Sequence, residues 1–290
     1  MGSTHSKAAI SKLANSKKSA LLSLLADEDP SVHKAIREEI ISYGPTVSTW
    51  LREHALDENP LLRRRTQEIV THFSRLEADT KFHAFCINHG ETFDLEEACW
   101  LLAQTVYPRM NPVAYSAILD DHAHDLMQKI DFGSEPEGII ASINHYLFKS
   151  IGYQGNEEEY YSAENSYLNR VIDLRSGNPI SLCIIYLLAC RRLGLPVTGI
   201  GLPGHFLCRF QNSRQELYID AFNMGRVLTK TDCMKYLKQS GYEFHETFLM
   251  PSSSRRILLR ICSNLHQIYL HEGKKEDASR LQGYIVSLSK

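Results

Sequence analysis

The longest unbroken apolar stretch in the chain runs from Leu182 to Cys190 and contains nine residues. A helix that is apolar on every side must be surrounded by other elements, so this segment is expected to be the central helix of a domain. The tripeptide Gly-Asn-Pro at 177–179 precedes it in the order turn residue, cap, first helical residue. Two arginines at 191–192 place positive charge at its C-terminal end, and Gly194 ends it.

Short apolar segments beyond this helix predict an antiparallel sheet. Residues 195–200, 205–210 and 217–220 have the length and composition of strands. The polar segment 211–216 is suited to a hairpin between the second strand and the third. A helix followed by such strands indicates an α+β domain.

Helical patterns fill most of the remaining chain. A capping-box-like start at Asp94 predicts a helix that ends near Pro108. Residues 152–165 are polar and predict an exposed loop. The other expected helices cover about 112–130, 137–148, a segment after 231, 255–270 and 275–288.

A short sequence motif, the echo below, is repeated in the N-terminal region. Ala-Asp-Glu-Asp-Pro at 26–30 recurs as Leu-Asp-Glu-Asn-Pro at 56–60. Proline is favoured in the first turn of a helix, so each copy predicts a turn that opens a helix. Paired helices with this turn resemble HEAT-type repeats, and an ordinary helical bundle explains the echo equally well. Residues 1–85 are therefore expected to form a helical region of one of these two kinds.

Composition narrows the class of protein. The 290 residues are 43% hydrophobic and 23% charged, which is typical of a globular chain. A net charge of -2 provides no overall field for nucleic acid or an anionic membrane, so neither is an expected partner. No stretch approaches the roughly 18–20 apolar residues of a membrane-spanning helix, and the N-terminus lacks a secretory pattern. Seven scattered cysteines fit a reducing compartment, so a cytoplasmic protein is expected.

Four motifs in fixed order carry a family resemblance. They are Gly-Asn-Pro-Ile-Ser-Leu at 177–182, Arg-Arg-Leu-Gly-Leu-Pro at 191–196, Gly-Leu-Pro-Gly-His-Phe-Leu at 201–207 and Asp-Ala-Phe-Asn-Met-Gly at 220–225. Together they resemble the transglutaminase-like domain of the bacterial SirB family, which also occurs in some eukaryotic F-box proteins. The resemblance implies a papain-like core over 86–250, with a buried helix on an antiparallel sheet. The helix pair in 251–290 resembles a tetratricopeptide-type unit.

The resemblance also implies a catalytic arrangement. In active members of the superfamily, a cysteine at the start of the buried helix is the nucleophile, a histidine on a following strand is its base, and an aspartate orients the histidine. His205 and Asp220 match the second and third positions. The first position falls on Pro179, which carries no nucleophile. Asn178 and Asn223, within the first and last motifs, are the candidate binding residues.

Cys183 is the alternative nucleophile. It lies four residues beyond Pro179, on the same helix face and one turn deeper. Its place within the apolar run favours a buried core thiol over a reactive one. His205 and Asp220 are then either a catalytic base with its orienter, or a hydrogen-bonded pair with a structural or binding role.

Two functions follow, and neither requires a metal or a cofactor. The first is a non-catalytic transglutaminase-like protein that acts in protein binding or regulation, with an unidentified protein partner. The second is a cysteine-dependent acyltransferase or peptidase that uses Cys183, His205 and Asp220. His83, Cys86 and His89 have metal-capable side chains at a spacing of three, but a closed zinc site needs a fourth ligand, so a helix surface is expected there.

Overall fold

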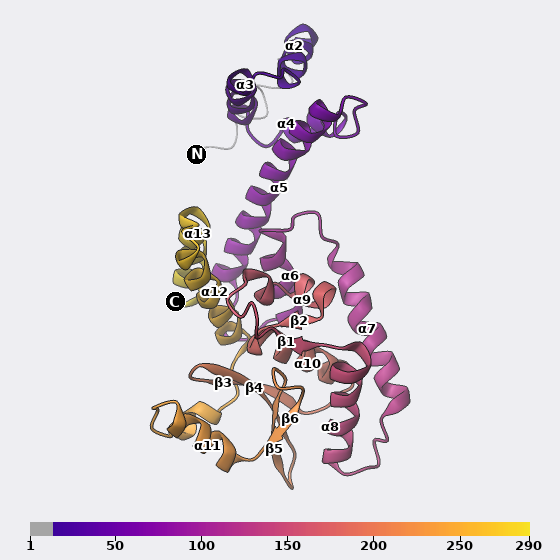
Figure 1. Cartoon of the computed structure of the whole chain (residues 1–290), viewed down its shortest axis with the longest axis vertical. Helices are drawn as coiled ribbons and strands as arrows, with labels where there is room; N and C mark the ends of the chain where they lie inside the picture. The colour runs from indigo at the N-terminus through magenta and orange to yellow at the C-terminus, as the bar shows by residue number, and fades with distance from the viewer. Residues whose placement is uncertain (1–13) are drawn as a thin grey trace. The chain divides into compact units, whose positions relative to one another are not determined.

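Helix α10 (Pro179–Arg192) is the most deeply buried helix of the computed structural model, which describes residues 14–290 (Figure 1). The chain divides into two units: residues up to 80 together with 104–109, and residues 81–103 together with 110–290. Helices, a four-stranded antiparallel sheet and a short parallel pair of strands make up the second unit. The expected α+β class is confirmed. The first part of the N-terminal segment inspected for a secretory signal, residues 1–13, lies outside the described residues.

The first unit is helical. Its elements are α2 (Asn15–Leu25), α3 (Pro30–Ser42), α4 (Val47–Arg52) and most of α5 (Pro60–Asn88). Pro30 and Pro60 are the first residues of their helices, as the repeated turn predicts. The Asp29 carboxylate caps α3 by accepting the Ser31 N–H at 2.8 Å. The hydrophobic core of this first unit contains Leu25, Ile40, Val47, Leu51 and Ile69.

In the second unit, α10 packs against β3 (Val197–Leu202) and β4 (His205–Gln211). Every side chain from 179 to 190 is buried except Leu187, which is half-buried. This confirms the central helix that the apolar run predicts. The sheet has the order β3-β4-β5-β6, with antiparallel neighbours throughout, and continues through β5 (Glu216–Asp220) and β6 (Arg226–Leu228).

The two faces of the sheet meet different helices. On one face Cys208 points to α10, where its thiol donates to the Cys183 carbonyl at 3.6 Å. On the other face Ile200 and Leu207, which are register partners, pack with α11 (Lys230–Gln239) and the 3₁₀ turn η3 (Glu246–Leu249). Because side chains alternate along a strand, each residue of the sheet points either toward α10 or toward α11 and η3.

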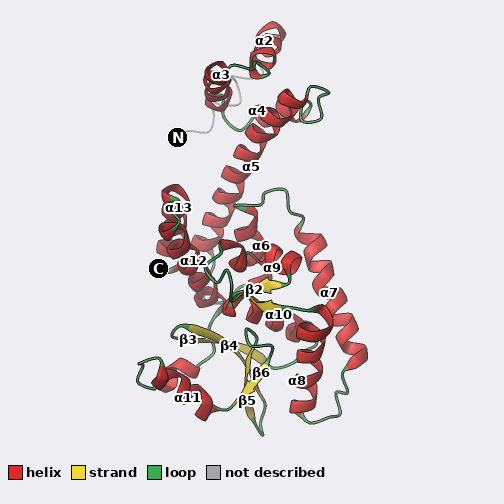
Figure 2. Ribbon diagram, viewed as in Figure 1, coloured by secondary structure: helices red, strands yellow, loops and turns green. Residues whose placement is uncertain are grey.

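The remaining elements surround this core (Figure 2). They are α6 (Leu95–Gln104), α7 (Pro112–Lys129), α8 (Pro136–Asn144), the π-helix η1 (His145–Ile151), β1 (Gln154–Gly155), the 3₁₀ turn η2 (Ala163–Ser166), α9 (Leu168–Leu174), β2 (Ser176–Gly177), α12 (Ser254–His271) and α13 (Lys275–Leu288). The parallel pair β1–β2 and strand β6 were not predicted, since two or three residues are too few to show a period. Between residues 14 and 290, no helix has the length and apolar character needed to cross a membrane.

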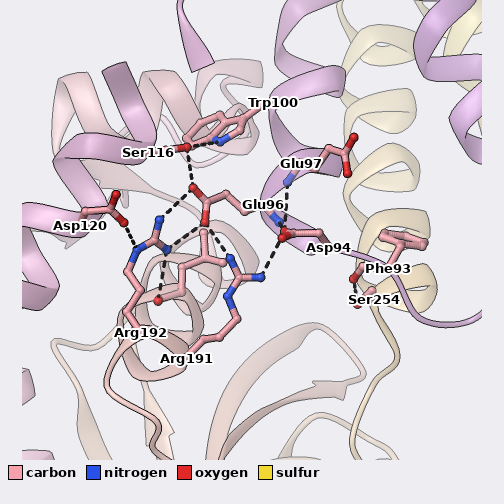
Figure 3. A network of polar contacts seen from close by, with 11 residues as sticks. Phe93, Asp94, Glu96, Glu97, Trp100, Ser116, Asp120, Arg191, Arg192 and Ser254 are labelled. Carbon is pink, nitrogen blue, oxygen red and sulfur yellow. Dashed lines mark hydrogen bonds and ion pairs between the residues drawn. The ribbon is translucent and has the colours of Figure 1, made fainter. Parts of the chain in front are cut away.

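A buried carboxylate anchors the C-terminal end of α10 (Figure 3). Glu96 on α6 accepts hydrogen bonds from Arg191 and Arg192 at 2.8 Å each, and from the Ser116 hydroxyl at 2.7 Å. Its side chain is 8% exposed. Burial alone would raise the pKa of Glu96, but the hydrogen bonds from Arg192 and Ser116 and the two arginine charges lower it. The two arginines thus hold α6 to the end of the central helix.

Replacing Glu96 by alanine should lower the free energy of unfolding by about 3 kcal/mol, because Arg192 is then left largely buried without its main partner. The matched control is Asp120→Ala, which removes an exposed carboxylate from the same arginine. That change should cost at most about 1 kcal/mol. Urea unfolding followed by circular dichroism measures both. Equal losses for the two variants would contradict an anchoring role for Glu96.

Candidate functional site

The N-terminal end of α10 is held by a reciprocal cap. The Asn178 side chain accepts the Ser181 N–H at 3.0 Å, and the Ser181 hydroxyl accepts the Asn178 N–H at 3.0 Å. The Asn178 amide also donates to the Ser166 hydroxyl at 2.9 Å. This cap fixes the backbone around Pro179, the first residue of the helix. Ser181 therefore has a structural role here.

His205 and Asp220 are in contact. The distance between His205 Nε2 and Asp220 Oδ2 is 2.9 Å, and their side chains are 13% and 8% exposed. Gly204, with a φ of +73°, makes the turn from β3 into β4 and so brings His205 to the start of its strand. Asp220 ends the neighbouring strand β5 on the same face. This is the pairing that the family resemblance predicts.

Asn223 supports this pair. Its backbone N–H and its side-chain amide donate to the two Asp220 oxygens at 3.2 and 2.8 Å. Burial would raise the pKa of Asp220, but the hydrogen bonds from His205 and Asn223 outweigh it, so the pKa lies below its usual value. Asp220 is therefore an ionised acceptor at neutral pH. The imidazole of His205 lies near the rings of Phe222 and Tyr236, with centroid distances of 6.4 and 5.7 Å.

Cys183 is not brought to this pair. Its side chain is fully buried between α10 and β4, where the thiol donates to the Phe206 carbonyl at 3.4 Å. His205 alternates with Phe206 along β4, so it lies with Leu207 on the face toward α11, and Cys183 lies beneath the opposite face. The geometry separates the two side chains that an alternative triad would require to meet.

A pocket of about 1140 Å³ opens where α10 begins. It brings together Pro179 and His205, the first turn of α10, the loop 158–162 and one side of α12. Its lining comprises Glu158, Glu159, Tyr160, Tyr161, Ser162, Asn178, Pro179, Ile180, Gly204, His205, Phe206, Arg260, Asn264, Gln267, Ile268, His271 and Glu272. Asn223 does not line it and acts through Asp220.

Sequence reasoning missed the contribution of α12. Arg260, Asn264, Gln267 and His271 all line the pocket, and they follow one another at intervals of three or four residues. Such spacing places polar side chains on one helix face. A polar stripe on an amphipathic helix was a usable signal, but nothing in the sequence indicated that this stripe lines a pocket at the start of α10.

His83, Cys86 and His89, the residues with metal-capable side chains, each have a different environment in the structure. His83 Nε2 lies 2.9 Å from the Ser287 hydroxyl, Cys86 is fully buried, and the His89 ring stacks on Phe85 with a centroid distance of 3.9 Å. In the described part of the chain, no three His, Cys, Asp or Glu side chains are grouped so that they could hold a metal ion.

The sequence of this domain matches a known superfamily. Residues 113–263 match the transglutaminase-like superfamily over more than half of the chain, and the chain belongs to it. That segment includes α10, the whole sheet, the His205–Asp220 pair and Arg260.

Among its relatives is a UPF0162 protein of Xylella fastidiosa, 35% identical over 204 residues, which are 68% of this chain and 73% of that protein. A UPF0162 protein of Pseudomonas aeruginosa is 26% identical over 196 residues, 64% of this chain and 70% of the relative. F-box only protein 21 of Mus musculus is 32% identical over 143 residues, 47% of this chain but 22% of that protein. No solved structure matches the chain significantly.

Asn223→Ala should lower stability at neutral pH and reduce the part of that stability that is lost in acid. The depressed pKa of Asp220 contributes stability that is present above its usual value of 3.8 and is lost as the pH falls through the lower folded value. Without the two Asn223 hydrogen bonds the pKa is less depressed, so stability near neutral pH falls by about 1 kcal/mol, and the loss on acidification is smaller and is complete at a higher pH. Urea unfolding across the acid range measures the shift. The same substitution in an Asp220→Asn background should produce none; a shift there would point to another group.

Proposed function

We propose that this chain is a non-catalytic member of the transglutaminase-like superfamily that acts in protein binding or regulation, with the pocket at the start of α10 as its binding site. The observation that carries the proposal is Pro179, which stands as the first residue of α10 in the pocket wall that also holds His205. Covalent catalysis of the superfamily's kind needs a thiol or hydroxyl at this position, within reach of its base. Proline supplies neither.

Proline also removes a second catalytic component. Acyl transfer develops negative charge on a carbonyl oxygen, and backbone N–H groups at a helix N-terminus are suited to stabilise it. Pro179 has no N–H, and the Ser181 N–H is already donated to Asn178. The start of α10 therefore lacks a nucleophile at Pro179, and neither residue 179 nor Ser181 offers a backbone N–H to an oxyanion.

The His205–Asp220 pair then serves binding. Asp220 accepts from Nε2 of the imidazole, so Nδ1 of a neutral His205 is an acceptor, and no partner for it is present among residues 14–290. A ligand N–H in the pocket could donate to this nitrogen. The fixed orientation of the ring, held by Asp220 and in turn by Asn223, supports such a role.

Several finer assignments belong to this proposal. We place the chain in the SirB-type branch, with the helix pair α12–α13 as a tetratricopeptide-like unit and the N-terminal helices, HEAT-like or bundled, as further surface. The similarity to part of F-box only protein 21 supports a role in protein interaction. All seven cysteines are free and buried, which supports action in the reducing cytoplasm.

The second candidate is a cysteine-dependent acyltransferase or peptidase. The intact His205–Asp220 contact favours it, since a base and its orienter are in place. It requires Cys183 to leave its buried position and reach the imidazole from the other side of the sheet.

Cys183 should resist iodoacetamide in the native protein at neutral pH. With its thiol fully buried and bonded to the Phe206 carbonyl, it should label on the order of 100-fold more slowly than in urea, where all seven cysteines are accessible. Peptide-level mass spectrometry measures the rate for each cysteine. His205→Ala is the control and should leave the slow rate unchanged. Fast labelling of Cys183 that requires His205 would overturn the non-catalytic proposal.

Pro179→Cys should create the thiol that the site lacks. A cysteine at the first position of α10 would face the pocket beside His205, where the helix dipole and an imidazole lower a thiol pKa. We expect it to label with iodoacetamide about tenfold faster at neutral pH than in a Pro179→Cys/His205→Ala double variant. Equal rates in the two proteins would show that His205 is not placed as a base for this position.

A further inference from the structure

Arg260 is the one arginine in the wall of the pocket. It extends from α12 with its guanidinium carbon 5.7 Å from the centre of the Phe206 ring, so the flat group is supported by an aromatic face. A Cβ atom built on Gly201 would lie 3.3 Å from Arg260 Nη1, so the absence of a side chain there leaves the room that the guanidinium occupies. The arginine is half-buried and held in place.

Arg260 lacks the partner that other buried arginines of this domain have. Arg192 pairs with two carboxylates, Arg209 lies 3.0 Å from Glu216, and Arg255 donates to backbone carbonyls at distances down to 2.7 Å. No carboxylate of residues 14–290 lies within ion-pair distance of Arg260. Burial lowers the pKa of its guanidinium, although arginine stays charged at neutral pH. A half-buried cation without a counter-charge is costly unless a ligand supplies one.

The rest of the pocket limits what that ligand can be. Glu158 and Glu159 are exposed at its edge and have no basic partner in the described chain, whereas Glu272 pairs with Lys274 at 2.8 Å. Two unpaired carboxylates disfavour a polyanion such as nucleic acid. They instead favour a ligand that carries a positive charge as well as an anion.

The size and lining of the pocket favour a peptide. Its volume of about 1140 Å³ exceeds the range of roughly 300–1,000 Å³ that is usual for small-molecule sites. The side-chain amides of Asn264 and Gln267 can each bond to a peptide backbone group. Tyr160 and Tyr161, whose ring centroids are 5.2 Å apart, offer aromatic contact at the edge.

We infer that the pocket binds a peptide segment through one of its carboxylates, held by Arg260, with a basic residue of the same segment beside Glu158 and Glu159. The inference rests on the proposed binding function and names its ligand class. The guanidinium can hold a carboxylate by two parallel hydrogen bonds. The carboxylate is either an Asp or Glu side chain or the free end of a chain, since both present the same group.

Selection of a randomised octapeptide library on the 290-residue protein tests the inference. Peptides with free and with amidated C-termini are selected separately, and affinities of the enriched peptides are measured by fluorescence anisotropy. We expect enrichment of one carboxylate with a nearby Lys or Arg. If peptides are still enriched in the amidated pool, the bound carboxylate is an Asp or Glu side chain. If enrichment is lost in that pool, the bound carboxylate is the free end of the chain. Enrichment, in the amidated pool, of sequences without Asp or Glu, or no enrichment in either pool, overturns the inference.

Arg260→Gln should lower the affinity for the enriched peptides about 10- to 100-fold, because a charge-assisted pair is lost. Arg260→Lys should lower this affinity less. The matched control is Arg256→Gln, an exposed arginine on the same helix outside the pocket lining, which should not change affinity. Thermal unfolding confirms that each variant is folded. Equal affinity of Arg260→Gln and the unsubstituted protein overturns the inference.

Slow native labelling of Cys183 with no carboxylate-dependent binding refutes only this inference, whereas fast His205-dependent labelling refutes the non-catalytic function itself.

Discussion

The burial of nearly every side chain from Pro179 to Cys190 is the constraint on which the rest of the second unit depends. A helix with no solvated side still has unpaired backbone groups at both ends, and these must be satisfied within the protein. At the N-terminal end Asn178 and Ser181 cap one another, and Ser166 fixes the cap. At the C-terminal end Arg191 and Arg192 neutralise the helix dipole and reach Glu96. The neighbouring elements are thereby tied to the two ends of one helix.

The same constraint decides where chemistry can occur. Side chains from the middle of α10, Cys183 among them, are enclosed by the sheet and the helices around it. Only the first turn meets the pocket, and its first residue is Pro179. A proline there suits the helix, because its fixed φ and missing N–H cost nothing at that position. Under the proposed function, the residue that stabilises the start of the central helix is also the one that leaves the nucleophile position beside His205 empty.

The sequence was most informative where local pattern and tertiary structure agree. The nine-residue apolar run could have only one environment, so α10 and its burial were predictable, and the motifs around His205 and Asp220 indicated their contact. The pocket was not predictable, because Arg260 lies some 55 positions from His205 and nothing local shows that its helix lines a pocket with the start of α10. The pair β1–β2 is likewise made by tertiary contact, with no periodicity to reveal it.

The charges of the pocket distinguish binding from turnover. An amide-transferring enzyme must stabilise an oxyanion that exists only in the transition state, and groups that bind a stable ground-state charge equally well before and during reaction increase affinity without increasing rate. At Pro179 the donor suited to a developing charge is absent, whereas Arg260 supplies a permanent cation suited to a charge that the ligand already carries. Together with an imidazole held by Asp220, this arrangement favours recognition of a stable anion over catalysis.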